Sequence, residues 1–240
     1  MSALYTSLFA DDASRLIAAG CFVLTVALYF ASKALYARFR SPWLTPLVAV
    51  PAVLAAIVMV TRIPYAVYLE DTRWLMWLLG PATVAFAVPI YEYRELLKRH
   101  WISLTVGVTV GIVVAVGGSL ALSKLLHLSP ELQRSLMTRS VSTPFALAVS
   151  DKIHAPKDLT ALFVIATGVC GMLFGEIVLA LVPLRTRLAR GALFGAAAHG
   201  VGTAKARELG SEEGVVASLT MMIAGVVMVL LAPLFSMLPL

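Results

Sequence analysis

The sequence predicts an all-α integral membrane protein of transporter type, with about seven or eight transmembrane helices, some of them broken, and one re-entrant segment. Hydrophobic residues make up 60% of the chain and charged residues only 13%, whereas charged residues form about 25% of a soluble domain. Short basic clusters separate the apolar runs, as expected of membrane spans and their loops. We expect residues 1–240 to form a single transmembrane domain.

The first half of the chain contains four apolar runs with lengths near the ~20 residues that a spanning helix needs. They are Leu16–Ser32, Ser41–Thr61, Trp74–Tyr91 and Trp101–Ser123. Three prolines predict a kink in the second run. The sequence Gly80-Pro81-Ala82-Thr83 and Pro89 predict that the third run is a broken helix. Four glycines in the fourth run predict close helix packing.

The second half contains two ordinary runs and a second broken element. Leu159–Leu184 is a predicted span with a single acid, Glu176, and Gly214–Leu240 is an uncharged last span. Gly191–Ala204 is too short and too rich in small residues for an ordinary span. We therefore expect this third segment to be a broken helix.

The stretch from Arg139 to Asp151 differs from all of these runs. Its uncharged part, Ser140–Ser150, has about half the length of a span and contains a proline and four hydroxyl side chains, three of them before the proline. Such polar backbone survives at membrane depth only when protein buries it or when it lines a wet cavity. We therefore expect a half-helix that enters the membrane and returns on the same side.

The basic clusters favour this path. The clusters are Lys33/Arg38/Arg40, Arg94/Lys98/Arg99 and Arg185/Arg187/Arg190. All three are cytoplasmic if Ser140–Ser150 returns, and the third is on the opposite side if that segment crosses, against the positive-inside rule. The first path has an outside N-terminus, seven spans and one re-entrant segment, and the second path has eight spans.

Several functional classes have little support. The formal charge of +6 comes from basic residues that lie between apolar runs, so nucleic-acid binding is not expected. Cys21 and Cys170 lie inside apolar runs without neighbours at metal-ligand spacing, and we interpret both as small packing residues. The chain has no nucleotide-binding loop, metal-ligand cluster or nucleophile elbow, so we expect no enzyme activity, no cofactor and no metal.

Three motifs together resemble the LrgB/CidB family over nearly the whole chain and in the right order. They are Leu79-Gly80-Pro81-Ala82-Thr83-Val84-Ala85, Arg139-Ser140-Val141-Ser142-Thr143-Pro144, and Ala198-His199-Gly200-Val201-Gly202-Thr203-Ala204-Lys205-Ala206 followed by Glu208 and Glu213-Gly214. The family is similar to the C-terminal half of the plastid glycolate/glycerate translocator. Arg139 stands where the family commonly has lysine, which keeps the charge but changes the geometry of anion contact.

The resemblance implies a multi-pass protein of the bacterial cytoplasmic (inner) membrane that works beside a small LrgA/CidA-type membrane protein or as a homo-oligomer. It also implies one of two functions. The first is transport of small monocarboxylates such as glycolate, glycerate, pyruvate or 3-hydroxypropionate. The alternative is a holin-like or antiholin-like regulator of murein hydrolases and cell lysis. A regulator needs little beyond spans that assemble, so the broken helices and their polar residues favour the transporter.

The candidate substrate-binding residues lie at the three breaks. They are Thr83, Arg139, Ser140, Ser142, Thr143, Pro144, His199, Gly200, Gly202 and Thr203. Arg139 is the candidate cation for a carboxylate, and the hydroxyls precede a half-helix whose free N–H groups could bind an anion. The structural alternatives are an interfacial anchor for Arg139 and close packing for the glycines.

Two ionisable residues at membrane depth are candidates for proton coupling. His199 titrates near neutral pH when it is unperturbed, and Glu176 is an acid within an apolar run. The structural alternative for His199 is a hydrogen bond to a backbone carbonyl. The structural alternative for Glu176 is an ion pair with a basic residue of a neighbouring helix.

Overall fold

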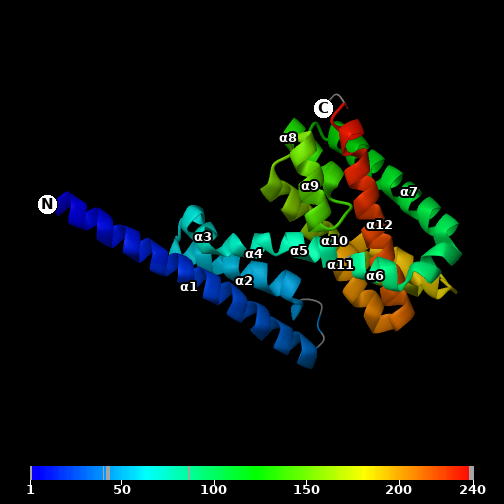
Figure 1. The fold of residues 1–240 in the computed structure, drawn as a ribbon, viewed down its shortest axis with the longest axis horizontal. Helices are drawn as coiled ribbons and strands as arrows, with labels where there is room; N and C mark the ends of the chain where they lie inside the picture. The colour runs from blue at the N-terminus through cyan, green and yellow to red at the C-terminus, as the bar shows by residue number, and fades with distance from the viewer. Residues whose placement is uncertain (1, 40, 42–43, 86, 238–240) are drawn as a thin grey trace. The chain divides into compact units, whose positions relative to one another are not determined.

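The computed structural model describes residues 2–39, 41, 44–85 and 87–237, and the side chains of these residues other than 2–13, 79, 82–83, 87 and 89. This part of the chain is helical and contains no strand (Figure 1), so the all-α prediction is confirmed. The helices are α1 (Ser2–Phe39), α2 (Pro46–Thr61), α3 (Tyr65–Thr72), α4 (Trp74–Trp77), α5 (Leu79–Ala85), α6 (Ala87–Glu92), α7 (Arg94–Leu125), α8 (Pro130–Thr138), α9 (Thr143–Ile153), α10 (Lys157–Leu181), α11 (Arg187–Leu209) and α12 (Ser211–Phe235).

Four of the described helices are long and apolar enough to cross a membrane: Ser14–Phe39 of α1, and α7, α10 and α12. Each of them contains most or all of a predicted span. The predicted run Ser41–Thr61 yields only the 16-residue helix α2, which begins at Pro46. The run Trp74–Tyr91 is divided among α4, α5 and α6, as the breaks in its sequence suggest. The total of seven or eight spans stays a prediction.

The chain divides into two compact units, Met1–Pro81 and Ala82–Leu240. In the first unit, α1 packs along α2 and α3. The hydroxyls of Thr25 on α1 and Tyr68 on α3 lie 3.2 Å apart, and Ser32 Oγ donates to the carbonyl of Leu44 at 2.9 Å. These contacts link α1 to α3 and to the turn that precedes α2.

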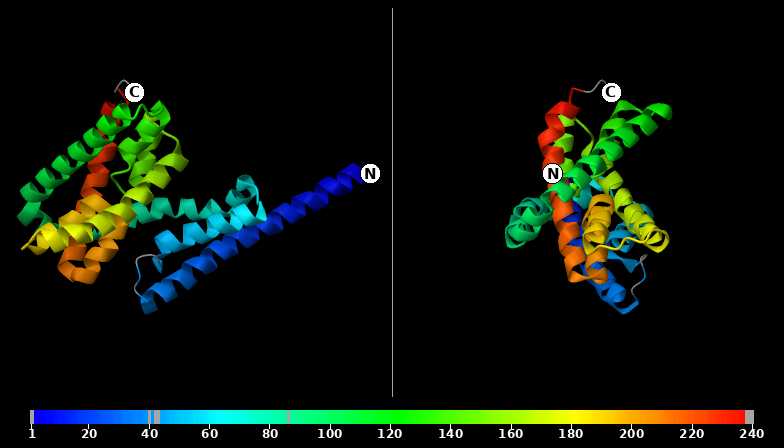
Figure 2. Two further views of the ribbon diagram at one scale, coloured as in Figure 1. Left: turned by 180° about the vertical axis from the view of Figure 1, so that it is seen from behind. Right: turned by 90° about the vertical axis from the view of Figure 1, so that its right-hand side faces the viewer.

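The second unit is organised around α12. Its apolar window is 61% buried, against 28% for α7 and 22% for α10, so α7 and α10 keep most of their apolar surface free for lipid. In Figures 1 and 2, α8 and α9 lie beside the C-terminal half of α12 and α11 beside its N-terminal half. The packing agrees with these views, because Phe145 of α9 contacts Gly225 and Gly195 of α11 contacts Ala217.

Helix α9 is short and has one buried face. It has a proline in its first turn and ends at His154, whose φ of 54° is left-handed. Its apolar side chains join a core made with α7, α8, α10 and α12: Phe145, Ala146, Val149 and Ile153. Eleven residues span about 16 Å at 1.5 Å each, half of a bilayer core. The half-length predicted for this segment is therefore observed, and its re-entrant path stays a prediction.

Glycines bring α11 into backbone contact with its neighbours. A Cβ atom at Gly171 of α10 would overlap the carbonyl of Ala197, and one at Gly195 would overlap the carbonyl of Ala217. The glycines of α7 behave differently from what the sequence predicts. A Cβ atom at Gly107, Gly111, Gly117 or Gly118 would meet nothing within 4 Å. The close packing expected at these four positions is therefore wrong for the described residues.

Candidate functional site

Arg139 lies in the turn between α8 and α9, where its side chain reaches two other helices. Its Nε atom donates to Ser119 Oγ of α7 at 3.0 Å, and its Nη1 atom donates to Thr167 Oγ1 of α10 at 3.4 Å. The side chain is partly buried. Two hydroxyls, one from α7 and one from α10, therefore hold the guanidinium in one place.

No carboxylate lies within ion-pair distance of Arg139 among the described residues. A guanidinium has five N–H donors, and the two hydroxyls occupy only two of them. Moving a cation out of water costs free energy unless an anion and further hydrogen bonds compensate. Arg139 is thus a positioned cation with spare donors, which suits an anionic ligand. If Arg139 were instead an interfacial anchor, its guanidinium would extend into water.

A cavity of about 470 Å³ lies in front of Arg139, between α7, α10 and α11. This volume is within the usual range for small-molecule sites. Arg139 is the single charged residue among the described lining residues, and Ser140 and Thr167 are also polar. Most of the remaining wall is apolar: Val108, Gly111, Ile112, Ala115, Leu136, Phe163, Ala166, Phe174, Ala196, Ala197 and Ala224. The cavity therefore suits a small molecule with one anionic end.

Two serines beside the N-terminus of α9 have hydroxyls without a partner. The Oγ atoms of Ser140 and Ser142 are buried and make no hydrogen bond. Ser142 occupies the N-cap position in an extended conformation, but its side chain does not cap the helix. Buried polar atoms are normally paired, because an unpaired donor or acceptor costs about 1–3 kcal/mol. Ser140 lines the cavity, whereas Ser142, Thr143 and Pro144 do not.

His199 interrupts α11 and lies near Arg139. Its φ of 48° and ψ of −124° break the helix at the position where the sequence predicts a break. The imidazole is 3% exposed and neither ring nitrogen has a hydrogen-bond partner of normal geometry. The backbone of Ser140 and the guanidinium of Arg139 lie near enough to act on its charge. Two of the predicted breaks therefore meet in space.

Two other candidate residues of the third motif, Gly202 and Thr203, have structural contacts, and Gly200 does not. Thr203 Oγ1 donates to the carbonyl of His199 at 2.8 Å. A Cβ atom at Gly202 would overlap the carbonyl of Phe194, so this glycine is needed for close packing. Gly200 is exposed and open. The side chain of Thr83 lies outside the described residues.

Glu176 forms an ion pair with a basic residue of a neighbouring helix, which is the structural alternative to proton coupling. Its Oε1 atom lies 2.6 Å from Lys205 Nζ of α11, and Lys205 also lies 3.3 Å from Glu208. The side chains of Glu176 and Lys205 are 39% and 25% exposed. Glu176 does not line the Arg139 cavity.

Sequence reasoning missed three residues of this site. Ser119 and Thr167 hold Arg139, and Cys170, interpreted as a packing residue, is exposed and lines the cavity. One signal was available. Thr167, Cys170, Gly171 and Phe174 follow the i, i+3, i+4, i+7 spacing of one helix face, and all four line the cavity.

Comparison with known proteins identifies the family. A model described as the LrgB-like family matches residues 25–238. The chain belongs to this LrgB family. This confirms the resemblance seen in the three motifs, and together with the four apolar helices it indicates a membrane protein. The LrgB family is a membrane protein family that is generally not enzymatic.

Two relatives of this LrgB family member come from Bacillus subtilis (strain 168). The uncharacterized protein YwbG is 39% identical over 210 residues, which cover 88% of this chain and 93% of YwbG. The uncharacterized protein YxaC is 30% identical over 212 residues, which cover 88% of this chain and 92% of YxaC. No solved structure matches the chain.

Proposed function

We propose that this LrgB family member is a secondary transporter that carries small monocarboxylates across the bacterial cytoplasmic (inner) membrane. The observation that supports it most is Arg139, which two hydroxyls hold at an apolar cavity with no carboxylate partner among the described residues. A substrate carboxylate would supply the missing anion. It would accept two hydrogen bonds from the guanidinium, since planar carboxylates and guanidinium groups pair in this bidentate way.

The cavity wall favours an acid with a single charge. A carboxylate at Arg139 places the rest of a small substrate against Ile112, Phe163 and Ala166. A second carboxylate would lose its hydration there without a second cation, which costs several kcal/mol. Glycolate, pyruvate and 3-hydroxypropionate each have one carboxylate and fit this pattern.

Alternating access requires the site to lie between elements that can move. We assign this role to α9, the half-helix beside Arg139, and to α11, which His199 divides. Half-helices that meet near the membrane midplane are the usual construction of secondary transporter sites. His199 is the proposed proton-coupling residue, because its ring nitrogens are unpaired and Arg139 lies nearby. Glu176 is a weaker candidate because Lys205 neutralises it.

Uptake of labelled glycolate, pyruvate and 3-hydroxypropionate into proteoliposomes tests the proposal, with and without an LrgA/CidA-type subunit. Arg139→Ala should weaken substrate binding by roughly 2 to 5 kcal/mol, the scale for breaking a buried charge pair. Arg139→Lys should keep much of the activity, because an ammonium group still binds an anion as a point charge.

Wild-type protein that neither binds nor accumulates any of the three acids, alone or with the subunit, would overturn the proposal. That result would favour the holin-like alternative, in which Arg139 has no ligand. If Arg139→Ala transports normally, Arg139 is an anchor and the anion site must involve Thr83 or His199 to Thr203.

A further inference from the structure

A second cavity, of about 260 Å³, lies between α7, α11 and α12. It shares Val108 and Ala196 with the Arg139 cavity. The two cavities therefore meet at these two side chains, one from α7 and one from α11. Ala196 is small, so the partition between the cavities is thin on the α11 side.

Thr220 of α12 is the buried polar residue of the second cavity. It is 2% exposed, and its Oγ1 atom has no hydrogen-bond partner. Threonines within helices commonly bond back to a carbonyl of the preceding turn, as Thr203 does with His199. Thr220 makes no such bond, so a buried and unpaired hydroxyl lies at a wall that is otherwise mostly apolar.

Basic segments flank the far end of this cavity. Ser103, three residues after the kink of α7 at His100, and Thr186, the N-cap residue of α11, both line it, and both are exposed. Ser103 follows a segment with Arg94, Lys98 and Arg99, and Thr186 lies within the segment that contains Arg185, Arg187 and Arg190. None of the described residues that line the cavity is charged.

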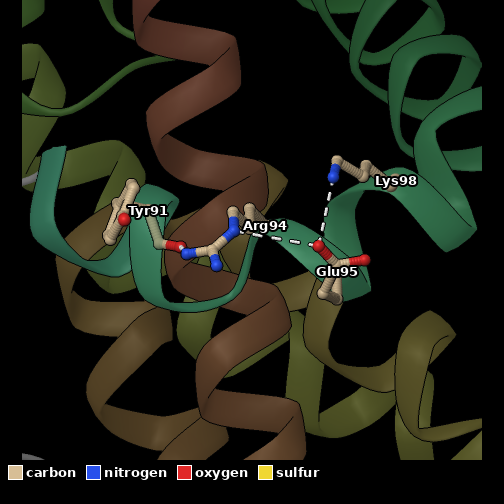
Figure 3. Close-up of polar contacts among 4 residues, drawn as sticks. All are labelled: Tyr91, Arg94, Glu95 and Lys98. Carbon is tan, nitrogen blue, oxygen red and sulfur yellow. Dashed lines mark hydrogen bonds and ion pairs between the residues drawn. The ribbon is translucent and has the colours of Figure 1, made fainter.

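Acidic residues pair with part of this charge and do not cancel it. Glu95 lies 3.1 Å from Lys98 and 3.8 Å from Arg94 (Figure 3), and Glu212 lies 2.9 Å from Arg187. Residues 94–99 and 185–190 together carry six basic residues and one acid, Glu95, and with Glu212 beside Arg187 the basic residues still outnumber their paired acids by six to two. A positive rim raises the local concentration of anions and guides them into a cleft.

We infer that the second cavity is a separate binding site for the same monocarboxylate, between the basic face and Arg139. This inference rests on the proposed function. The basic rim attracts the anion, and Thr220 donates a hydrogen bond to its carboxylate. Because no described lining residue is a cation, the acid keeps part of its hydration on the side of the exposed Ser103 and Thr186 and binds here more weakly than at Arg139. Val108 and Ala196 separate this site from the next. The two cavities are then consecutive binding sites on one transport path, and the acid passes from one to the other between Val108 and Ala196.

The glycines of α7 allow a sharp test, because they lie in open space. Gly107 lines only the second cavity and Gly118 lines neither, and a side chain at either position meets no atom within 4 Å at its Cβ. Gly107→Leu should fill the second cavity without disturbing the helix, since leucine favours helix more than glycine does. We expect Gly107→Leu to reduce uptake of labelled pyruvate into proteoliposomes about tenfold or more. A tenfold loss corresponds to the free energy of about one hydrogen bond to a charged group. Pyruvate binding at the Arg139 cavity in detergent should remain, and Gly118→Leu should retain both.

Thr220→Val is a second variant, and it separates a binding role of the Thr220 hydroxyl from a structural role, because uptake and melting temperature should respond differently. It keeps the shape of the side chain and removes an unpaired buried hydroxyl, so the melting temperature should stay the same or rise. Uptake at low pyruvate concentration should nevertheless fall about tenfold, because a hydrogen bond to the carboxylate is lost.

The outcomes distinguish this inference from the proposed function. If the wild-type protein neither binds nor transports an acid, the proposed function fails. If the wild-type protein does both and the Gly107→Leu and Thr220→Val variants also transport normally, the second site is wrong while the Arg139 site stands. The second site is also wrong if Thr220→Val lowers uptake and the melting temperature together, since the hydroxyl then serves stability.

Discussion

The Nε atom of Arg139 lies 3.0 Å from the Oγ atom of Ser119, which itself donates to the carbonyl of Ala115 at 2.7 Å. The serine thus uses its proton on its own helix and offers a lone pair to the guanidinium. This arrangement orients the cation without neutralising it. A carboxylate in place of Ser119 would pair with Arg139 and would compete with any anionic ligand.

Ser119→Ala should therefore weaken pyruvate binding by about 1 kcal/mol, or roughly fivefold, because the guanidinium loses an orienting hydrogen bond. Equilibrium dialysis with labelled pyruvate measures the change. Ser123→Ala is the matched control, since Ser123 lies one turn further on α7, is also buried, and its hydroxyl donates to the carbonyl of Leu120 and to no other described residue. Equal effects of the two variants would show that Ser119 acts through the stability of α7.

Cys170 should report on ligand binding through its alkylation rate. It is exposed and lines the Arg139 cavity, whereas Cys21 is 5% exposed. A maleimide should therefore modify Cys170 first, and saturating pyruvate should slow that reaction because it occupies the same cavity. Mass spectrometry of the Cys170 peptide over time gives the rate. An unchanged rate under conditions where pyruvate is shown to bind would place the ligand elsewhere.

Gly195→Ala and Gly200→Ala should have different effects on stability, although both glycines lie in α11. A Cβ atom at position 195 would overlap the backbone of Ala217, so Gly195→Ala should destabilise by about 1–3 kcal/mol, as overpacking does. Position 200 is open, and no described glycine has a positive φ, so Gly200→Ala should be neutral or stabilising by up to about 1 kcal/mol. Thermal unfolding in detergent compares them. Equal melting temperatures would mean that the contact between α11 and α12 is looser than the structure shows.

His199→Gln should flatten the pH dependence of uptake, because it removes the proposed proton-coupling group beside Arg139. Glu176→Gln should leave that profile unchanged, and it should cost less than about 1 kcal/mol of stability because the ion pair with Lys205 is partly exposed. Uptake rates over a range of pH values separate the two residues. If the double variant keeps the rate and the profile of the wild type, neither residue carries the proton.

Local features of the sequence predicted the breaks well. A short uncharged segment with hydroxyls and Pro144 became the half-helix α9, because proline fits the first turn of a helix and eleven residues cannot cross the bilayer. A segment of small residues around His199 became the broken helix α11. Both predictions depended on backbone conformation, which residues adjacent in the sequence largely determine.

The partners of Arg139 could not be predicted in this way. Ser119 and Thr167 lie 20 and 28 residues from it along the chain, on helices that only the tertiary packing brings together. The prediction of close packing at the glycines of α7 was wrong for a related reason. Small residues allow either close packing or an open space, and Gly107 and Gly111 line cavities. The arrangement of the neighbouring helices decides between these outcomes.

The contact between Phe145 of α9 and Gly225 of α12 has a consequence for biogenesis. A Cβ atom at position 225 would overlap the ring of Phe145, so the first turn of α9 packs directly on the last described helix. The ribosome adds about 5–20 residues per second, so α12 follows α9 roughly 4 to 16 s later. During that interval the half-helix and its unpaired serines lack their main apolar partner. We expect insertion factors or chaperones to shield this segment, and the anion site to be completed only after α12 has been synthesised.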